Sequence, residues 1–242
     1  MERIPTVAIM GVNIAALDIN KLIGFTKNNI NELKGKYICV ANVFTTVTAF
    51  ENPDYLNVQN NSILTIPDGG PLASLGRRKG YDIQRITGQD YMHEVFKNGY
   101  KHFFYGSTQE TLDKMKNVLK KQYPNINIVG MYSPPFRDLN GEEDCEIIDI
   151  INGTNPDFVW VGLGAPKQEY WMYNHREKIN GLMVGVGAAF DYYAGNIKRA
   201  PEWMQKSNLE WLYRLIQEPK RLFKKYLVSN SKFVWNAIIK GK

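Results

Sequence analysis

The sequence contains few of the residues from which metal sites and disulfide frameworks are built. Its 242 residues include two cysteines, Cys39 and Cys145, which do not have the spacing of zinc ligands. The three histidines, His93, His102 and His175, are scattered and form no ligand motif. We therefore expect neither a zinc enzyme nor a histidine-based catalytic triad, and a reducing compartment is the simplest expectation.

Long apolar runs are also missing from the sequence. None approaches the roughly 18 residues that a membrane-spanning helix requires. The first apolar run, Val7 to Val12, is followed by Asn13 and Asp18, which does not fit a secretory signal. With 44% hydrophobic and 22% charged residues, the composition is typical of a globular protein, and we expect it in the cytoplasm.

The first 195 residues lack the positive charge that the chain carries as a whole. The net charge is +6, but residues 196–242 contain eleven Lys and Arg against three Glu, so they carry +8 and the remainder carries −2. A nucleic-acid-binding surface would extend over more of the chain, whereas a basic terminal segment suits anionic lipid or diphosphate. We predict a core over residues 1–195 and a basic helical appendage over residues 196–242.

Two short apolar runs, Phe158 to Leu163 and Leu182 to Val186, have the composition of strands that are covered on both faces of a parallel sheet. Each run ends in Gly-x-Gly, and the four glycines are Gly162, Gly164, Gly185 and Gly187. In an open α/β sheet, ligands bind beyond the carboxyl ends of the strands, where glycine lets the backbone approach them closely. We expect the glycines to line one crevice, although tight turns alone would explain each of them.

The rest of the core alternates between strand and helix patterns. Further strands are expected at Val7 to Val12, Tyr37 to Phe44, Ser62 to Ile66, His102 to Tyr105 and Asn127 to Tyr132. Helices are expected at Asp18 to Asn31, from Ser107 to about Gln122, at Gln168 to Lys178, at Leu209 to Gln217 and from Pro219 onward. Ser107 and Glu110 predict a capping box. The alternation predicts an α/β, Rossmann-like fold with a largely parallel sheet and helices on both faces.

Several long motifs occur in register along the chain. They are PDGGPL at Pro67 to Leu72, RITGQD at Arg85 to Asp90, FFYGSTQET at Phe103 to Thr111, GLGAPKQE at Gly162 to Glu169, GVGAAFDYYAGNIKRAPEW at Gly185 to Trp203 and LEWLYRLIQEPKR at Leu209 to Arg221. In this order the motifs resemble the WecG/TagA/CpsF family of bacterial glycosyltransferases, glycosyltransferase family 26. The resemblance covers nearly the whole chain, so it is more specific than one glycine fingerprint.

The resemblance implies a set of catalytic residues. They are Asp68 as the base, Asn42 and Gln168 as positioning groups, and Arg85, Arg214 and Arg221 as cations that stabilise the leaving diphosphate. Simpler roles are open for several of them: an Asp before a Gly is a common turn former, Arg85 could pair with Asp90, and Gln168 could cap its helix.

Substrate contacts are expected at the turns that follow the strands. The residues are Gly69, Gly106, Ser107, Tyr132, Gly164, Lys167, Gly187 and Asp191. Free amide groups at a helix start such as the one after Gly106 suit a phosphate or a ribose. Asp191 could bond uracil or ribose, and a structural role in a turn is an equal alternative.

The reaction that the resemblance implies is an inverting, metal-independent glycosyl transfer without a cofactor. The donor would be a UDP-sugar carrying a hexose or N-acetylhexosamine, with N-acetylmannosamine first, and the acceptor a sugar on polyprenyl diphosphate. Such a step belongs to cell-surface polysaccharide or teichoic acid synthesis. The aromatic and basic terminal helices would complete the site and place the enzyme peripherally on the inner face of the cell membrane, with a homo-oligomer possible.

Two other classes of protein are weighed against this one. An NAD-dependent oxidoreductase would carry Gly-x-Gly-x-x-Gly after its first strand, and Met10, Gly11, Val12 and Asn13 do not supply it. A basic nucleic-acid-binding module is disfavoured by the acidic core, so we expect no nucleic-acid partner.

Overall fold

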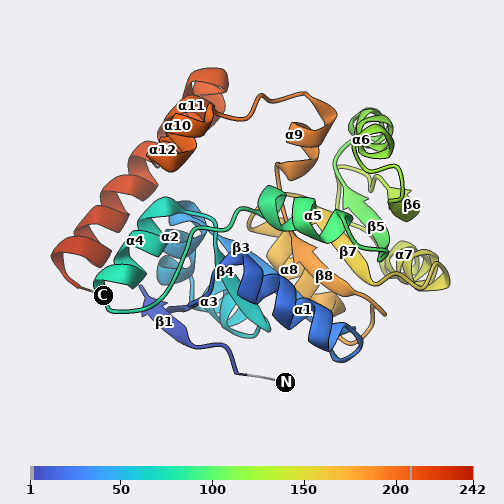
Figure 1. The fold of residues 1–242 in the computed structure, drawn as a ribbon, viewed down its shortest axis with the longest axis horizontal. Helices are drawn as coiled ribbons and strands as arrows, with labels where there is room; N and C mark the ends of the chain where they lie inside the picture. Colours follow the sequence, from blue (N-terminus) through green and yellow to red (C-terminus); the bar gives the residue numbers. More distant parts are fainter. Residues whose placement is uncertain (1–2, 208, 242) are drawn as a thin grey trace.

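The computed structural model describes residues 3–207 and 209–241 and is built on a six-stranded sheet. All neighbouring strands pair in parallel, in the order β4-β3-β8-β7-β5-β6. The strands are β3 (Tyr37–Ala41), β4 (Leu64–Pro67), β5 (Lys101–Gly106), β6 (Asn127–Tyr132), β7 (Phe158–Gly162) and β8 (Leu182–Gly185). The predicted α/β class with a parallel sheet is confirmed (Figure 1).

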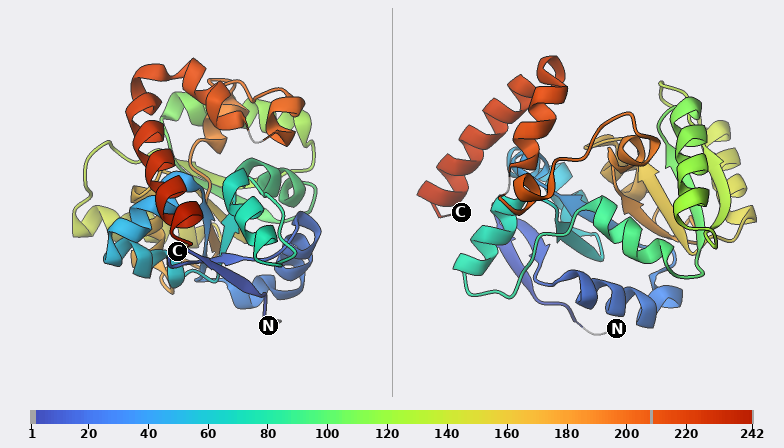
Figure 2. Two further views of the ribbon diagram at one scale, coloured as in Figure 1. Left: turned by 90° about the vertical axis from the view of Figure 1, so that its left-hand side faces the viewer. Right: turned by 45° about the horizontal axis from the view of Figure 1, so that its top comes forward.

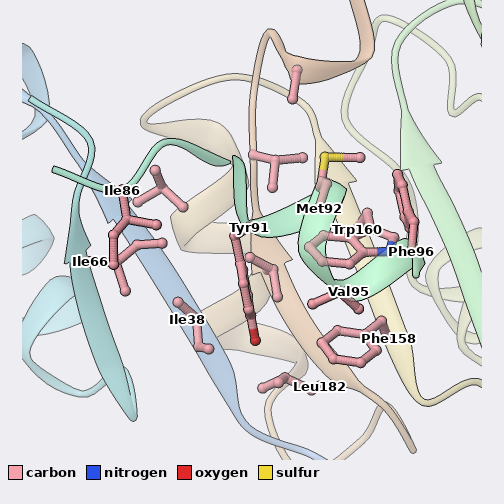
Figure 3. Packing of buried hydrophobic residues seen from close by; sticks show 14 of the residues in the cluster. Ile38, Ile66, Ile86, Tyr91, Met92, Val95, Phe96, Phe158, Trp160 and Leu182 are labelled. Atoms are coloured by element: carbon pink, nitrogen blue, oxygen red, sulfur yellow. The ribbon is translucent and has the colours of Figure 1, made fainter. Parts of the chain in front are cut away.

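Both faces of the sheet are buried, as the apolar runs predict. In β7, Phe158 and Trp160 pack into one hydrophobic cluster, and Val159 and Val161 pack into another. The first cluster includes residues of α1 (Ile19–Leu33), α5 (Gly88–Phe96) and α6 (Gln109–Gln122), and the second includes residues of α7 (Gly141–Gly153) and α8 (Lys167–His175). Figure 3 shows Tyr91 of α5 lying beside Trp160, with ring centroids 5.8 Å apart. The central strands therefore have helices on both sides.

The sequence predicted one strand over the amino-terminal apolar run, Val7 to Val12, and this prediction is wrong. The run folds into an antiparallel hairpin of β1 (Thr6–Ile9) and β2 (Val12–Ala15), which lies outside the six-stranded sheet. The turn residues Met10 and Gly11 have φ angles of 50° and 85°. Two residues with positive φ match the twist of a tight hairpin, so the chain reverses within the run.

Other predicted boundaries are wrong by a few residues. The second strand ends at Ala41, and Val43 begins α2 (Val43–Glu51), which α3 (Pro53–Asn60) follows. The next strand is displaced to Leu64–Pro67, and α4 (Gly70–Arg78) comes after it. Helix α8 ends at His175, before the predicted Lys178. In α6 the N-cap is Thr108, whose side chain accepts from the Thr111 amide, so the capping box predicted at Ser107 is wrong.

The carboxyl-terminal part is helical, as predicted. It comprises α9 (Ala189–Ala194), α10 (Glu202–Lys206), α11 (Glu210–Gln217), α12 (Pro219–Phe233) and a π-helical extension, η1 (Val234–Ile239). Figures 1 and 2 show an extended stretch leading from α9 to α10, with α12 running back along the molecule. Phe233 and Ala237 are buried in one cluster with Val47 of α2 and Tyr55 of α3. The end of the appendage is therefore part of a hydrophobic core.

Among residues 3–207 and 209–241, no helix has both the length and the apolar character that crossing a bilayer requires.

Candidate active site

Several predicted site residues lie at one edge of the sheet, where the parallel strands end. The register pairs Ala41 with Pro67, Val161 with Gly185 and Gly106 with Gly162, so the carboxyl ends of these strands coincide. The residues that follow them are Asn42 after β3, Asp68 after β4, Ser107 after β5, Gly164 after β7 and Gly187 after β8. This is the edge at which open α/β sheets bind ligands.

Asp68 lies in a turn that is fastened to the end of β3. The amides of Asp68 and Gly69 both donate to the carbonyl oxygen of Ala41, at 2.8 and 3.2 Å. A Cβ atom at Gly69 would lie 3.3 Å from the Cα of Asn42. The glycine thus lets the two turns approach, and it brings the backbones of Asn42 and Asp68 together.

The carboxylate of Asp68 is partly withdrawn from water, with 30% of its side chain exposed. This desolvation raises its pKa to about 6; Arg85 and Arg214 oppose the rise, and Glu210 and Asp90 add to it. A carboxylate with a pKa near neutrality is ionised at pH 7 and binds a proton more readily than an ordinary Asp does. Both properties suit a general base.

Arg85 connects Asp68 to the carboxyl-terminal helices. Its Nε donates to the Asp68 carbonyl oxygen at 2.7 Å, its Nη1 to the Gln205 carbonyl oxygen at 3.5 Å, and its Nη2 to the Glu210 carboxylate. The alternative partner considered from the sequence, Asp90, pairs with Arg199 at 2.6 Å. A salt bridge from Arg85 to Asp90 is therefore wrong.

Asn42 forms the N-cap of α2. Its Oδ1 accepts from the Thr45 amide at 3.2 Å, and the Thr45 hydroxyl accepts from the Asn42 amide at 2.9 Å, which completes a capping box. The hydroxyl of Thr46 donates to the Asn42 carbonyl oxygen at 2.9 Å. The threonines after this strand thus belong to the start of a helix.

The side chain of Gln168 bonds to both glycine turns. Its Oε1 accepts from the amides of Gly164 and Gly187, at 3.2 and 3.0 Å, and its Nε2 donates to Glu169 at 2.8 Å. The side chain is 3% exposed. Gln168 therefore fixes the relative position of these turns through bonds to their backbones, so any effect on substrate passes through the turns.

The glycines divide into two groups, so the expected single crevice is only partly formed by them. A Cβ atom would lie 2.6 Å from the Phe190 ring at Gly162 and 2.7 Å from Met172 at Gly185, so both glycines make room for buried side chains. Gly164 and Gly187 have φ angles of 80° and 53°, and a Cβ atom at Gly164 would meet no atom within 4 Å. Gly164 thus faces open space.

The remaining predicted contacts surround this edge. A Cβ atom at Gly106 would lie 2.6 Å from the backbone of Gly162. Ser107 has a φ angle of 60°, and its carbonyl oxygen accepts from the Ser133 hydroxyl at 2.7 Å. Tyr132 stacks on Tyr105 with centroids 6.1 Å apart. The Lys167 ammonium lies 4.0 Å from Asp138, and its side chain is exposed.

A pocket of about 570 Å³ lies between α9, the loop after it and the junction of α11 with α12. Its lining residues are Asp191, Asn196, Ile197, Gln217, Glu218 and Arg221. The Asn196 side-chain amide donates to the Asp191 carboxylate at 3.1 Å, so Asp191 has the structural role that was the alternative from the sequence. The predicted Asp191 and Arg221 thus line one cavity.

Two of the three appendage arginines, Arg214 and Arg221, meet at Glu218. Arg221 donates to the Glu218 carboxylate at 2.5 Å, and Arg214 approaches the same carboxylate at 3.5 Å. The Arg214 guanidinium lies 5.7 Å from the centroid of the Tyr192 ring and close enough to Asp68 to lower its pKa. Arg214 therefore stands between the pocket and the Asp68 turn.

Glu210 and Tyr192 are further candidate site residues, which the sequence did not predict. Glu210 contacts Arg85 across 125 residues of sequence, and Tyr192 lies under Arg214. Both belong to motifs that were quoted, LEWLYR and FDYY, so the signal was present. An acid in a first helical turn is usually explained by the helix dipole alone, which conceals its long-range partner.

The fold is of the α/β class, and the candidate site lies at the carboxyl edge of its parallel sheet. A family model described as "Glycosyl transferase WecG/TagA/CpsF family" matches residues 7–242. The chain belongs to this family and is a glycosyltransferase, so the expected resemblance is confirmed.

Three curated relatives share the name N-acetylglucosaminyldiphosphoundecaprenol N-acetyl-beta-D-mannosaminyltransferase. The relative from Bacillus subtilis strain 168 is 33% identical over 81% of this chain and 77% of its own length. The relative from Bacillus spizizenii is 31% identical over 79% of this chain and 75% of its own length. The relative from Staphylococcus aureus strain MW2 is 32% identical over 82% of this chain and 77% of its own length.

Proposed function

We propose that this glycosyltransferase moves an N-acetylmannosaminyl group, with inversion, from a UDP-sugar to an N-acetylglucosaminyl group on polyprenyl diphosphate. The names of its relatives support the transferred sugar and the lipid-linked acceptor. The single observation that carries the chemistry is Asp68, a partly desolvated carboxylate at the ligand-binding edge of the sheet with arginines around it. The pathway would be cell-surface polysaccharide or teichoic acid synthesis.

The proposed step is one displacement at the anomeric carbon. The acceptor hydroxyl gives its proton to the Asp68 carboxylate as its oxygen forms a bond to that carbon. The bond from the carbon to the diphosphate oxygen breaks, and the electron pair leaves with UDP. Because entry and departure take place on opposite faces of the sugar, the configuration inverts.

Charge that develops on the leaving diphosphate needs fixed cations nearby. Arg214 and Arg221 reach this region from the appendage, and Glu218 holds both until a more highly charged anion competes for them. The pocket beside Arg221 would hold the nucleotide, with Asp191 toward uracil or ribose. Arg85 remains a predicted third cation, although its donors in this structure serve Asp68, Gln205 and Glu210.

The appendage has the surface of a helix segment that lies on a membrane. Large apolar side chains are exposed along it at Trp203, Trp211, Ile216, Phe223, Leu227, Val228, Val234, Trp235, Ile238 and Ile239. Lys220 and Lys224 are exposed beside them. The ammonium of Lys225 lies 3.4 Å from the centroid of the Phe44 ring. We propose peripheral binding to anionic lipid, which would bring the lipid-linked acceptor to Asp68.

The test is a panel of UDP-sugars with a lipid-diphosphate acceptor, assayed for released UDP. UDP-N-acetylmannosamine should give the highest rate, and Asp68→Asn should lower it by about 10² to 10⁴, the range for loss of a general base. The variant should still bind the donor, because its amide occupies the space of the carboxylate. If no UDP-sugar is transferred or hydrolysed by the wild type, the proposed function is wrong.

A further inference from the structure

One guanidinium joins the core to the helices that cover it. The Glu210 carboxylate, in the first turn of α11, accepts from Nη2 of Arg85, and their side chains are 14% and 21% exposed. The Nε of the same guanidinium is bonded to the carbonyl oxygen of Asp68. Arg85 therefore links the predicted base, at the end of β4, directly to α11.

The pair is less exposed than most ion pairs among the described residues. The pairs Lys21–Asp82 and Lys97–Glu94 are largely exposed, and water and salt weaken such pairs. Arg85 and Glu210 are mostly covered, and a charged partner removed from such a pair leaves the other charge desolvated and unpaired. The ion pair therefore stabilises the position of α11 in which Glu210 contacts Arg85.

Docking at Glu210 also places Arg214. The two residues are four apart in α11, so they lie on one face of the helix. Glu210 meets Arg85 on the core, and Arg214 meets the Tyr192 ring of α9. A helix that is free at Glu210 would carry Arg214 away with it.

We propose that Glu210 is a positioning residue, whose ion pair with Arg85 docks α11 over Asp68 and thereby sets the place of Arg214. This inference rests on the proposed function, in which Arg214 stabilises the leaving diphosphate. Glu210 itself touches no reacting atom in this arrangement. It acts through Arg85 on one side and through its own helix on the other.

The docked helix also changes the electrostatic surroundings of the base. Charged and titratable groups from several elements face Asp68. They are Arg85 from the loop before α5, Asp90 from α5, Tyr192 from α9, Glu210 and Arg214 from α11, and Tyr226 from α12. Burial is the largest cause that raises the pKa of Asp68, and the charge of Glu210 adds to it. Without Glu210, the burial of Asp68 and the negative charge beside it both decrease, which lowers the pKa of Asp68. Displacement of Arg214 would raise this pKa, but its contribution is smaller than that of burial or of Glu210. The pKa of Asp68 should fall.

The experiment compares Glu210→Gln with the wild type in the full-length chain. We expect kcat/KM for UDP release to fall at least about tenfold, because Arg214 is misplaced. The acidic limb of the pH–rate profile should move to lower pH, and backbone amides of residues 210–217 should exchange faster with deuterium. Glu210→Asp, which keeps the charge, should restore part of each property.

Glu51→Gln is the matched control. Glu51 pairs with Lys232 of α12, so this pair also joins the appendage to the core, but its side chains are 47% and 44% exposed and it is not among the groups around Asp68. We expect an unchanged pH profile and unchanged exchange in residues 210–217. Arg85→Lys keeps a cation without its fork of donors, and it should speed exchange in α11 as Glu210→Gln does.

The outcomes separate this inference from the proposed function. If Glu210→Gln leaves both the pH profile and the exchange of α11 as in the wild type, Glu210 does not dock the helix. If the wild type transfers no sugar, the proposed function fails, while the exchange of Glu210→Gln and Arg85→Lys still decides whether the contact docks α11. Equal effects of Glu51→Gln and Glu210→Gln would also overturn the inference, because any loosening of the appendage would then suffice.

Discussion

Asp68 must be ionised to accept a proton, and partial burial holds its pKa at about 6. Transfer should therefore be slow below pH 5, rise as the carboxyl deprotonates through about pH 6, and level off above pH 7. An ordinary Asp, with a pKa near 4, would place this limb about two pH units lower. Initial rates of UDP release at saturating donor and acceptor measure the limb. A profile that stays flat down to pH 4.5 would rule out Asp68 as a base with a raised pKa.

At the same scale, what the sequence predicted depends on whether a residue's partners are local. Asp68, Asn42 and Gln168 each follow a strand or a glycine turn, so their place at the sheet edge is predictable from order alone. Glu210 was missed because its partner Arg85 is 125 residues away, and no local pattern predicts that distance. The capping box at Ser107 failed by one residue, since the positive φ of Ser107 passes the capping role to Thr108.

Helix α2 begins at a residue with two proposed roles, and two substitutions separate them. Asn42→Ala removes the cap and should lower the free energy of unfolding by about 1 kcal/mol. Asn42→Asp keeps an oxygen that caps equally well, so its unfolding should match the wild type. If Asn42 also positions substrate through its amide group, Asn42→Asp should lower kcat/KM despite full stability.

Denaturant unfolding and UDP release, measured on both Asn42 variants, check this. Full activity of the Asp variant would leave Asn42 with a capping role alone. Loss of stability in the Asp variant equal to that in the Ala variant would contradict the capping account itself.

Among the elements, the sequence predicted β7 and β8 to within one residue. Apolar runs in β7 and β8 are buried on both faces, which only a covered parallel strand requires. The hairpin of β1 and β2 was missed because Met10 is not a turn former by type, and the run continues through it without a polar residue. Tertiary packing against α2 and α3 supports that turn, and this support is not visible in the local sequence.

For the whole molecule, the appendage has two surfaces in different surroundings. Phe233 and Ala237 are buried against the core, and Arg85 holds α11 at the site, so the division predicted at residue 195 does not separate two independent hydrophobic cores. The outer surface remains apolar and exposed over α11, α12 and η1. Charge asymmetry predicted this segment from sequence, whereas its two-sided packing depends on contacts that only the fold brings together.

If the outer surface binds membranes, replacing its apolar side chains with polar ones should weaken binding to lipid vesicles. Phe223 and Leu227 are four apart on α12 and are 59% and 57% exposed. Phe223→Ser with Leu227→Ser should weaken sedimentation with vesicles that contain phosphatidylglycerol by about tenfold or more, because burial of such side chains contributes roughly 1.5–3 kcal/mol each at most. Ile150→Ser on α7, which replaces an apolar side chain that is 46% exposed elsewhere, should leave sedimentation unchanged. Added salt should weaken binding of the wild type, because the exposed Lys220 and Lys224 would face the lipid head groups. Equal sedimentation of the double variant and the wild type would instead assign this surface to another partner, and a shift from dimer to monomer in the double variant would identify that partner as a second copy of the chain.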